Sequence, residues 1–278
     1  MSTLLLDARA DGDVRQKGAF MTVEELFGIK IEPSEKTSPG DKVRFTAGVR
    51  DVLARILDSE GGKALARSIR FHKKTVLLQP YEGGDGCNAQ EWHWGTRGET
   101  YSTVRFSPGS CGSGGCSAPC KGIINASLPH EVLFHELVHS LRRVSGHMHS
   151  WLLLGKMLNY QDSEEFTAIL TTNIFISDVT NHRKSGLRAD YATDDALDPA
   201  LADSFGFFAT GTKAFNLIAT FCDENRAFTN MLAHLHARFN PIAAYNQNQR
   251  KAFDIAAEGD SEEVFRHTFG AATANTGP

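Results

Sequence analysis

The sequence of 278 residues contains no long hydrophobic run and no run of basic side chains. No apolar stretch approaches the roughly 18 residues that a membrane-spanning helix needs, so we expect no membrane span. The formal net charge is −4, which gives no argument for a nucleic-acid partner. Hydrophobic residues make up 41% of the chain and charged residues 22%, which is the balance of an ordinary globular protein.

The N-terminus also lacks the features of a conventional signal peptide. Residues 1–9 contain the three leucines Leu4, Leu5 and Leu6, but no basic segment precedes them. If the protein is exported, it therefore uses another route or begins as the mature chain.

The length fits one large domain or two small ones, and we favour a single domain. Residues 1–43 are mixed and polar, with Pro33 and Pro39, and are expected to form an arm or a loosely attached lead-in. Residues 44–270 are expected to form the domain. Residues 271–278 are small and polar, which predicts a flexible tail.

Hydrophobic spacing predicts a mostly helical chain with a small sheet. Helical spacing occurs over residues 43–57, 62–69, 213–221, 224–238 and 250–257. The string Glu60-Gly61-Gly62 is expected to interrupt the first two of these helices. Residues 74–79 and 101–106 have the composition of short strands.

The cysteines are few and odd in number. They are Cys87, Cys111, Cys116, Cys120 and Cys222. The spacing C-x4-C-x3-C of the central three matches no common zinc knuckle. In an oxidising setting Cys87 and this cluster could form two disulfides, which we favour. Free thiols and a second, structural metal site stay open as alternatives.

The most informative string is His135-Glu136-Leu137-Val138-His139, which has the form H-E-x-x-H. Positions four apart lie on one face of an α-helix, so both imidazoles can reach one zinc ion. Apolar residues occupy the opposite half of the expected helix: Leu133, Phe134, Leu137, Val138, Leu141 and Val144. We therefore predict that His135 and His139 face a cleft and bind zinc. The alternative is a pair of surface histidines without a metal.

The ends of this helix are also marked in the sequence. Ser127 and Pro129 suit its beginning, and Gly146 suits its end. Arg142 and Arg143 fall in the last turn, where basic side chains complement the helix dipole.

A catalytic zinc needs a third protein ligand and leaves one position for water. The metzincin pattern would place glycine at position 142 and histidine at position 145, but Arg142 and Ser145 stand there. His147 and His149 follow Gly146 and are expected to be exposed loop residues rather than ligands. The third ligand must therefore come from elsewhere in the chain.

The better candidate lies on the next expected helix, which follows Asp162. Glu165 borders the apolar face of this helix, whereas Glu164 points nearly the opposite way, so burial favours Glu165 over Glu164. The alternative is structural, because Asp162 suits an N-cap and Glu165 could complete a capping box. Asn173 lies within the apolar face and could orient a ligand or satisfy nearby backbone.

A zinc site of this kind predicts hydrolysis. Zinc would polarise the scissile carbonyl and lower the pKa of its water toward about 7. Glu136 would act as the general base and pass the proton to the leaving amine. Arg188 and Tyr191 are candidate donors to the developing oxyanion, as is Tyr160, although each of them could instead be a surface or packing residue.

Three segments carry a family resemblance. The run 133–143 with Gly146, the stretch 164–170 with Thr172-Asn173-Ile174, and the stretch 187–191 resemble the NleD-like family of zinc metallopeptidase effectors. The resemblance covers roughly residues 45–195. It implies an α+β, zincin-like fold, mostly helical with a small mixed sheet beside the H-E-x-x-H helix. It also implies zinc on His135, His139 and Glu165, with Glu136 as the base.

The resemblance further implies an effector-like or toxin-like zinc endopeptidase with a protein substrate. The best known members cut mitogen-activated protein kinases of the host, so a host signalling kinase is an expected partner. The protein is then expected to be soluble and secreted, or translocated into a host cell. The alternatives are a zincin-fold protein that binds a partner without hydrolysis, which the intact His-Glu-His set disfavours, and a hydrolase of small peptides or amides.

Overall fold

A computed structural model of the chain describes residues 22–35, 37–81, 89–92, 101–108, 128–153, 159–181, 186–189, 196–197 and 213–248. These residues form a mixed α+β structure that is mostly helical with one small mixed sheet, which confirms that part of the expected fold class. Within the described residues, no helix combines the length and the hydropathy needed to cross a membrane.

The helices are α1 (Val23–Phe27), α2 (Pro39–Leu57), α3 (Glu60–Phe71), α4 (Pro129–Ser145), α5 (Ser163–Ser177), α7 (Lys213–Glu224) and α8 (Arg226–Ala233). The strands are β1 (Ile29–Ile31), β2 (Thr75–Pro80), β3 (Ala89–Trp92) and β4 (Tyr101–Phe106). Residues 241–248 are also helical. The strands expected over 74–79 and 101–106 are confirmed, as are the helices expected over 43–57, 62–69 and 213–221. The helix expected over 224–238 ends earlier, at Ala233, and the one expected over 250–257 lies outside the described residues.

The expected interruption at Glu60-Gly61-Gly62 is instead the first turn of α3. Ser59 caps this helix, because its hydroxyl accepts a hydrogen bond from the Gly62 N–H at 3.0 Å. A Cβ at position 62 would lie 1.8 Å from the carbonyl oxygen of Ile56. Glycine is therefore required here because α2 and α3 approach closely, and it does not break the helix.

The segment before residue 43 takes part in the fold from residue 22 onward. Thr22 caps α1 by accepting a hydrogen bond from the Glu25 N–H, and the Glu25 carboxylate accepts one from the Thr22 N–H. Phe27 is fully buried and Ile29 nearly so. The expected arm is therefore wrong for these residues, since two apolar side chains anchor them in the core, and the expected boundary at 43 falls inside α2.

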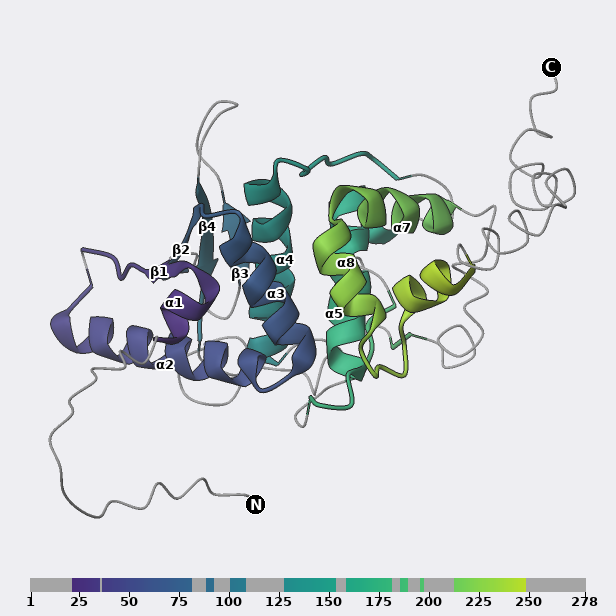
Figure 1. The fold of residues 1–278 in the computed structure, drawn as a ribbon. Helices are drawn as coiled ribbons and strands as arrows, with labels where there is room; N and C mark the ends of the chain where they lie inside the picture. Colours follow the sequence, from purple (N-terminus) through teal and green to yellow (C-terminus); the bar gives the residue numbers. More distant parts are fainter. Residues whose placement is uncertain are drawn as a thin grey trace, which may run out of the picture.

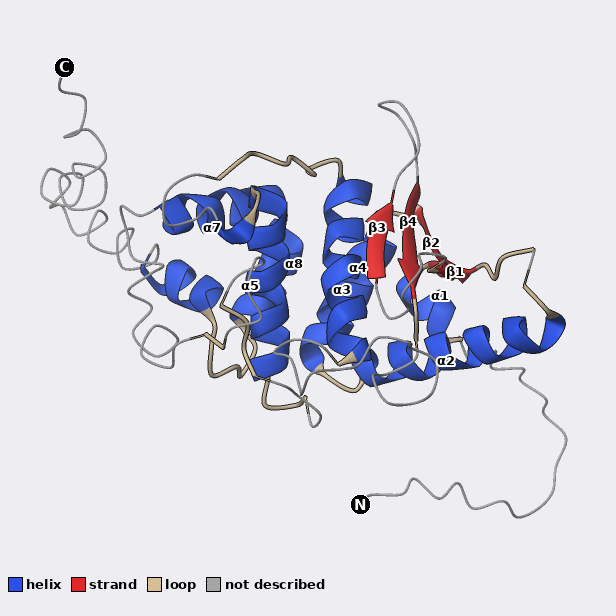
Figure 2. Cartoon of the chain, turned by 180° about the vertical axis from the view of Figure 1, so that it is seen from behind, coloured by secondary structure: helices blue, strands red, loops and turns tan. Residues whose placement is uncertain are grey.

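The sheet has the order β1-β2-β4-β3, in which β1, β2 and β4 are parallel and β3 is the antiparallel edge strand. Helices α3 and α4 lie between this sheet and the group formed by α5, α7 and α8 (Figure 1). The view from behind shows the same arrangement, with the strands on one side of α3 and α4 and the helices α5, α7 and α8 on the other (Figure 2). Helix α4 packs against β3, β4 and α5, so it occupies the centre of the molecule.

The apolar face of α4 is buried as expected. Its members Leu133, Phe134, Leu137, Val138, Leu141 and Val144 are each at most 2% exposed. The Phe134 ring stacks on the Phe175 ring of α5, with 4.1 Å between centroids. Burying each such side chain contributes roughly 1.5–3 kcal/mol, so these contacts keep α4 packed between the sheet and α5.

Candidate metal site

The helix that carries the H-E-x-x-H string has the expected ends. Pro129 occupies its first position after Leu128, and the Glu131 carboxylate accepts a hydrogen bond from the Leu128 N–H. Gly146 ends the helix with φ of 81°, a left-handed conformation that glycine adopts without strain. Ser127 lies outside the described residues.

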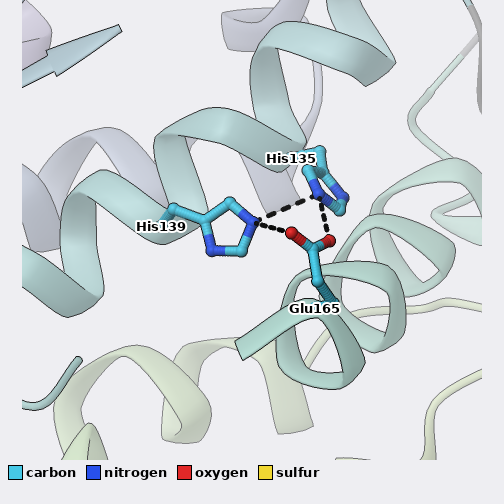
Figure 3. Close-up of side chains that lie close together, drawn as sticks. All are labelled: His135, His139 and Glu165. Atoms are coloured by element: carbon cyan, nitrogen blue, oxygen red, sulfur yellow. Dashed lines mark hydrogen bonds and ion pairs between the residues drawn. The ribbon is translucent and has the colours of Figure 1, made fainter. Parts of the chain in front are cut away.

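Two histidines of α4 and one glutamate of α5 converge on one point (Figure 3). The Nε2 atoms of His135 and His139 lie 3.2 Å apart, and the Glu165 carboxylate lies 3.2 Å from the first and 3.5 Å from the second. A tetrahedral zinc with bonds of 2.0–2.1 Å separates its ligand atoms by about 3.3 Å. The spacing of these three donors therefore fits one small cation.

Glu165 reaches this point because of how α5 begins. The Asp162 side chain caps the helix by accepting hydrogen bonds from the N–H groups of Glu164 and Glu165, both at 2.9 Å. The backbone N–H of Asp162 donates instead to the carbonyl of Tyr160. The Glu165 carboxylate therefore faces His135 and His139, as the ligand prediction expects, and the capping-box alternative is not what forms.

Glu164 differs from the expectation that it would point away from the buried side. It is 2% exposed, less than Glu165, whose side chain is 18% exposed. Burial alone would therefore have selected Glu164, which does not join the converging donors. Glu164 is buried because the Arg142 guanidinium binds both of its oxygens, which compensates its charge.

Glu136, the expected general base, lies beside the three donors and is held by the edge strand. Its carboxylate accepts a hydrogen bond of 2.6 Å from the backbone N–H of Glu91 on β3. Burial raises the pKa of the Glu136 carboxyl, against the lowering effect of His135, His139 and this N–H. A carboxyl with a raised pKa is a stronger proton acceptor than an ordinary one, as general-base catalysis requires.

Sequence reasoning missed Glu91 and its partner Arg143. The Arg143 guanidinium donates to both oxygens of the buried Glu91 carboxylate, one of them at 2.8 Å, and the Ser102 hydroxyl donates to the same carboxylate at 2.7 Å. Arg143 was expected only to complement the helix dipole. It also ties β3 to α4, and so places the Glu91 N–H against Glu136. The string Ala89-Gln90-Glu91-Trp92 gave little signal, because it is short and its polar and apolar residues do not alternate.

The expected oxyanion donors are only partly described. The backbone of Arg188 is tied to α5, because the Asn173 side chain donates to the Arg188 carbonyl and accepts from its N–H. Asn173 thus bonds backbone, one of its two expected roles. Tyr160 is buried, and its hydroxyl donates to the Ala189 carbonyl at 2.6 Å, which is a packing role. Tyr191 lies outside the described residues.

The other histidines and the cysteine that the structure describes do not join the three converging donors. His149 is exposed and stacks on Trp151, and His147 is partly buried, so neither joins the three donors. Cys222 is a buried free thiol whose pKa burial raises to about 12, which makes it unreactive at neutral pH. The predictions for Cys87, Cys111, Cys116 and Cys120 lie outside the described residues.

The chemistry of the donors limits which cation fits. Two imidazoles and one carboxylate suit zinc and other first-row transition metals, whereas calcium and magnesium prefer oxygen ligands alone. The Nδ1 atom of His139 is buried without a hydrogen-bond partner among the described residues. The imidazole of His139 therefore makes its polar contacts there through Nε2. The three side chains therefore fit a small metal ion of this class.

The charges of the metal-free site respond to pH. Burial disfavours protonated His139, but its hydrogen bond and charge attraction to Glu165 outweigh this and raise its pKa to about 9. Burial acts to raise the pKa of Glu165, and the two histidines outweigh it and lower that pKa. Because the pKa of His139 rises on folding, its ion pair stabilises fully below pH 6.5 and is lost as pH rises through about 9.

We therefore expect the metal-free protein to lose stability between pH 6.5 and about 9. Melting temperatures measured across this range with a chelator present should fall more for the wild type than for His139→Gln, which has no proton to lose. His149→Ala, which alters an exposed histidine, should behave as the wild type. Equal slopes for the wild type and His139→Gln would contradict the raised pKa of His139.

Comparison with known proteins adds nothing to the site. No protein-family model, no curated protein and no solved structure matches the chain.

Proposed function

We propose that the protein is a zinc-dependent endopeptidase with a zincin-like fold, whose ligands are His135, His139 and Glu165. The observation that supports this best is the convergence of the three donors with the Glu136 carboxylate beside them. Convergence of metal ligands alone would support only metal binding, whereas a neighbouring base adds the proton acceptor that peptide hydrolysis uses. A partly buried carboxylate next to a metal site can accept a proton from water there.

In this proposal zinc, Glu136 and the Glu91 N–H have separate roles. Zinc, when bound, would polarise the scissile carbonyl. It would also lower the pKa of water, so that the water gives up a proton more easily and attacks the carbonyl carbon. Glu136 would take the proton of the attacking water and deliver it to the leaving amine nitrogen, and its raised pKa suits both transfers. The Glu91 N–H would hold the carboxylate in position between these events.

The edge strand supports a polypeptide substrate over a small amide. The N–H of Glu91 points at Glu136, and in an antiparallel strand the carbonyl of the same residue points to the same side, away from β4. An extended substrate could pair with this edge by strand addition, which would bring its backbone beside Glu136. The family resemblance adds the effector-like role and a host signalling kinase as the expected substrate.

The proposal is tested by searching for newly formed peptide ends in a host-cell lysate. Wild-type protein should generate new N-termini within one or a few proteins, and Glu136→Gln should generate none of them. Chelator-treated wild type should also be inactive, and added zinc should restore it. Cleavage of short peptides but of no intact protein would favour the small-peptide hydrolase. No cleavage by zinc-loaded wild type would favour a protein that only binds a partner.

A further inference from the structure

A buried ion-pair cluster lies directly behind the metal ligands. Arg142 follows His139 by three residues on α4, and its side chain is only 5% exposed. Its guanidinium donates to both oxygens of Glu164, at 3.0 and 2.8 Å, and to Glu224 of α7 at 2.6 Å. It also lies over the Phe221 ring, 5.7 Å from its centroid. One side chain thus joins α4, α5 and α7.

Glu164 connects this cluster to the ligand set. It immediately precedes Glu165 in the first turn of α5, where the Asp162 side chain binds the N–H groups of both residues. Glu164 also accepts the backbone N–H of His149 at 2.8 Å, which fixes the loop between the two helices. Any shift of Glu164 relative to Arg142 would therefore move Glu165 relative to His139.

The energetics favour a positioning role over a stabilising one. Removing a guanidinium and a carboxylate from water costs about as much as their attraction returns, so a buried pair adds little net stability. Its contribution is to fix the orientation of Glu164 relative to Arg142. The apolar contacts of α4 and α5, such as Phe134 on Phe175, hold the helices together but tolerate sliding. The bidentate hydrogen bonds from the Arg142 guanidinium to the Glu164 carboxylate do not tolerate such sliding.

The cluster also controls the charge around the site. Glu136, Glu164 and Glu165 lie close enough that all three act on His139. Arg142 compensates Glu164 and Glu224, which leaves Glu165 and Glu136 as the carboxylates available to a cation and to a proton. Without it, Glu164 would repel Glu165 and draw the cation or a proton toward itself.

We propose that Arg142, through Glu164, is a positioning residue that sets Glu165 against His135 and His139 for metal binding. The inference rests on the proposed metal site, but not on hydrolysis. It assigns to Arg142 a function that neither the helix dipole nor the packing of α4 requires. The role is distinct from that of Arg143, which ties the opposite side of α4 to β3.

The test is metal binding by the full-length Arg142→Lys variant. Lysine keeps the positive charge, so Glu164 is not left uncompensated, but it lacks the fork that binds both carboxylate oxygens. Zinc affinity, measured by competition with a chelator, should fall about 10- to 100-fold, as when a residue that supports a metal ligand is lost. The visible absorption of the Co²⁺-loaded protein, which reports ligand geometry, should change as well.

The matched control is Arg226→Lys, which alters an exposed Arg–Asp pair at 3.3 Å on a neighbouring helix. It should bind zinc and Co²⁺ as the wild type does. A purely structural role of Arg142 would lower the melting temperature of the metal-free protein while leaving affinity and spectrum unchanged, and that result would overturn the proposal. If Arg142→Lys does not fold, Glu224→Gln removes one partner at the partly exposed end of the cluster and should weaken zinc binding several-fold; unchanged binding there would count equally against it.

A double-mutant cycle separates action through Glu165 from a general effect. Arg142→Lys should cost no further affinity in a Glu165→Ala background, because the side chain that it positions is already gone. Independent, additive losses would overturn the proposal. Wild-type protein that binds no zinc at all would remove the metal site itself, and with it the proposed function.

Discussion

Glu136→Gln should abolish most hydrolysis while leaving the metal in place. The glutamine side chain has nearly the same shape and can still accept the Glu91 N–H, but it cannot carry a proton between water and the leaving amine. Loss of a general acid–base residue lowers turnover by about 10²- to 10⁴-fold. We therefore expect kcat to fall by this factor on the substrate identified from its new N-termini.

Metal content distinguishes a lost base from a lost site. Glu136 is not one of the three converging donors, so Glu136→Gln should retain one zinc per chain by elemental analysis. Glu60→Gln, which changes an exposed carboxylate on α3, serves as the matched control and should keep both zinc and activity. Turnover near the wild-type rate in zinc-loaded Glu136→Gln would remove Glu136 from the mechanism.

The pH profile of the wild type gives a second readout of the same residue. Burial raises the pKa of Glu136, and a zinc ion bound beside the carboxylate would lower it, so the rising acid limb of kcat/KM should lie below the pH range that burial alone would give. Activity requires the ionised carboxylate, so the rate should increase as pH rises through this pKa. An acid limb that keeps its position in Glu136→Gln would show that another group controls it.

The parts of the site that could be predicted depend on short-range rules. His135 and His139 share a face because of helical spacing, and Pro129 and Gly146 mark the helix ends by their backbone preferences. The same applies to Asp162, whose capping role places the following acidic residues in the first turn of α5. Each inference used residues within one or two turns of one another.

The choice between Glu164 and Glu165 shows where such rules fail. Glu165 is the carboxylate that converges with the two histidines, but the reason given for preferring it was greater burial, and Glu164 is in fact the more buried. The burial of Glu164 depends on Arg142, which lies 22 residues earlier, and on Glu224, which is 60 residues later. Contacts at this separation leave no periodic signal in the sequence, because they arise only when α4, α5 and α7 pack.

The edge strand was missed for a related reason. Strand β3 has only four residues, and its link to the site is a backbone N–H, which has no sequence signature. The segment with Phe27 and Ile29 was taken for an arm because polar residues dominate the first 43 positions, although a few apolar side chains suffice to anchor a strand. Short elements of this kind are defined by their neighbours rather than by their own composition.

His139→Ala should remove the metal and its effect on stability. His139 supplies one of the three converging atoms, and its side chain is 6% exposed, so no solvent-facing residue can replace it. A ligand at 100 times its dissociation constant stabilises a fold by about 2.7 kcal/mol. For a protein of this length that corresponds to a rise of about 5 °C in melting temperature. The wild type should show this rise with zinc and lose it with a chelator.

The variant should show no zinc-dependent rise, and its zinc content should fall from one per chain to none. Comparing each variant with itself, with and without chelator, separates loss of the metal from loss of the His139–Glu165 ion pair. His149→Ala should keep the full rise, since that histidine lies on an exposed loop. Glu165→Ala, which keeps both histidines, should lose most of it, and Glu164→Gln should weaken it less, because Glu164 acts on the metal only by positioning its neighbour. If His139→Ala keeps one zinc per chain, the ion is bound elsewhere, and Cys111, Cys116 and Cys120 become the residues to change next.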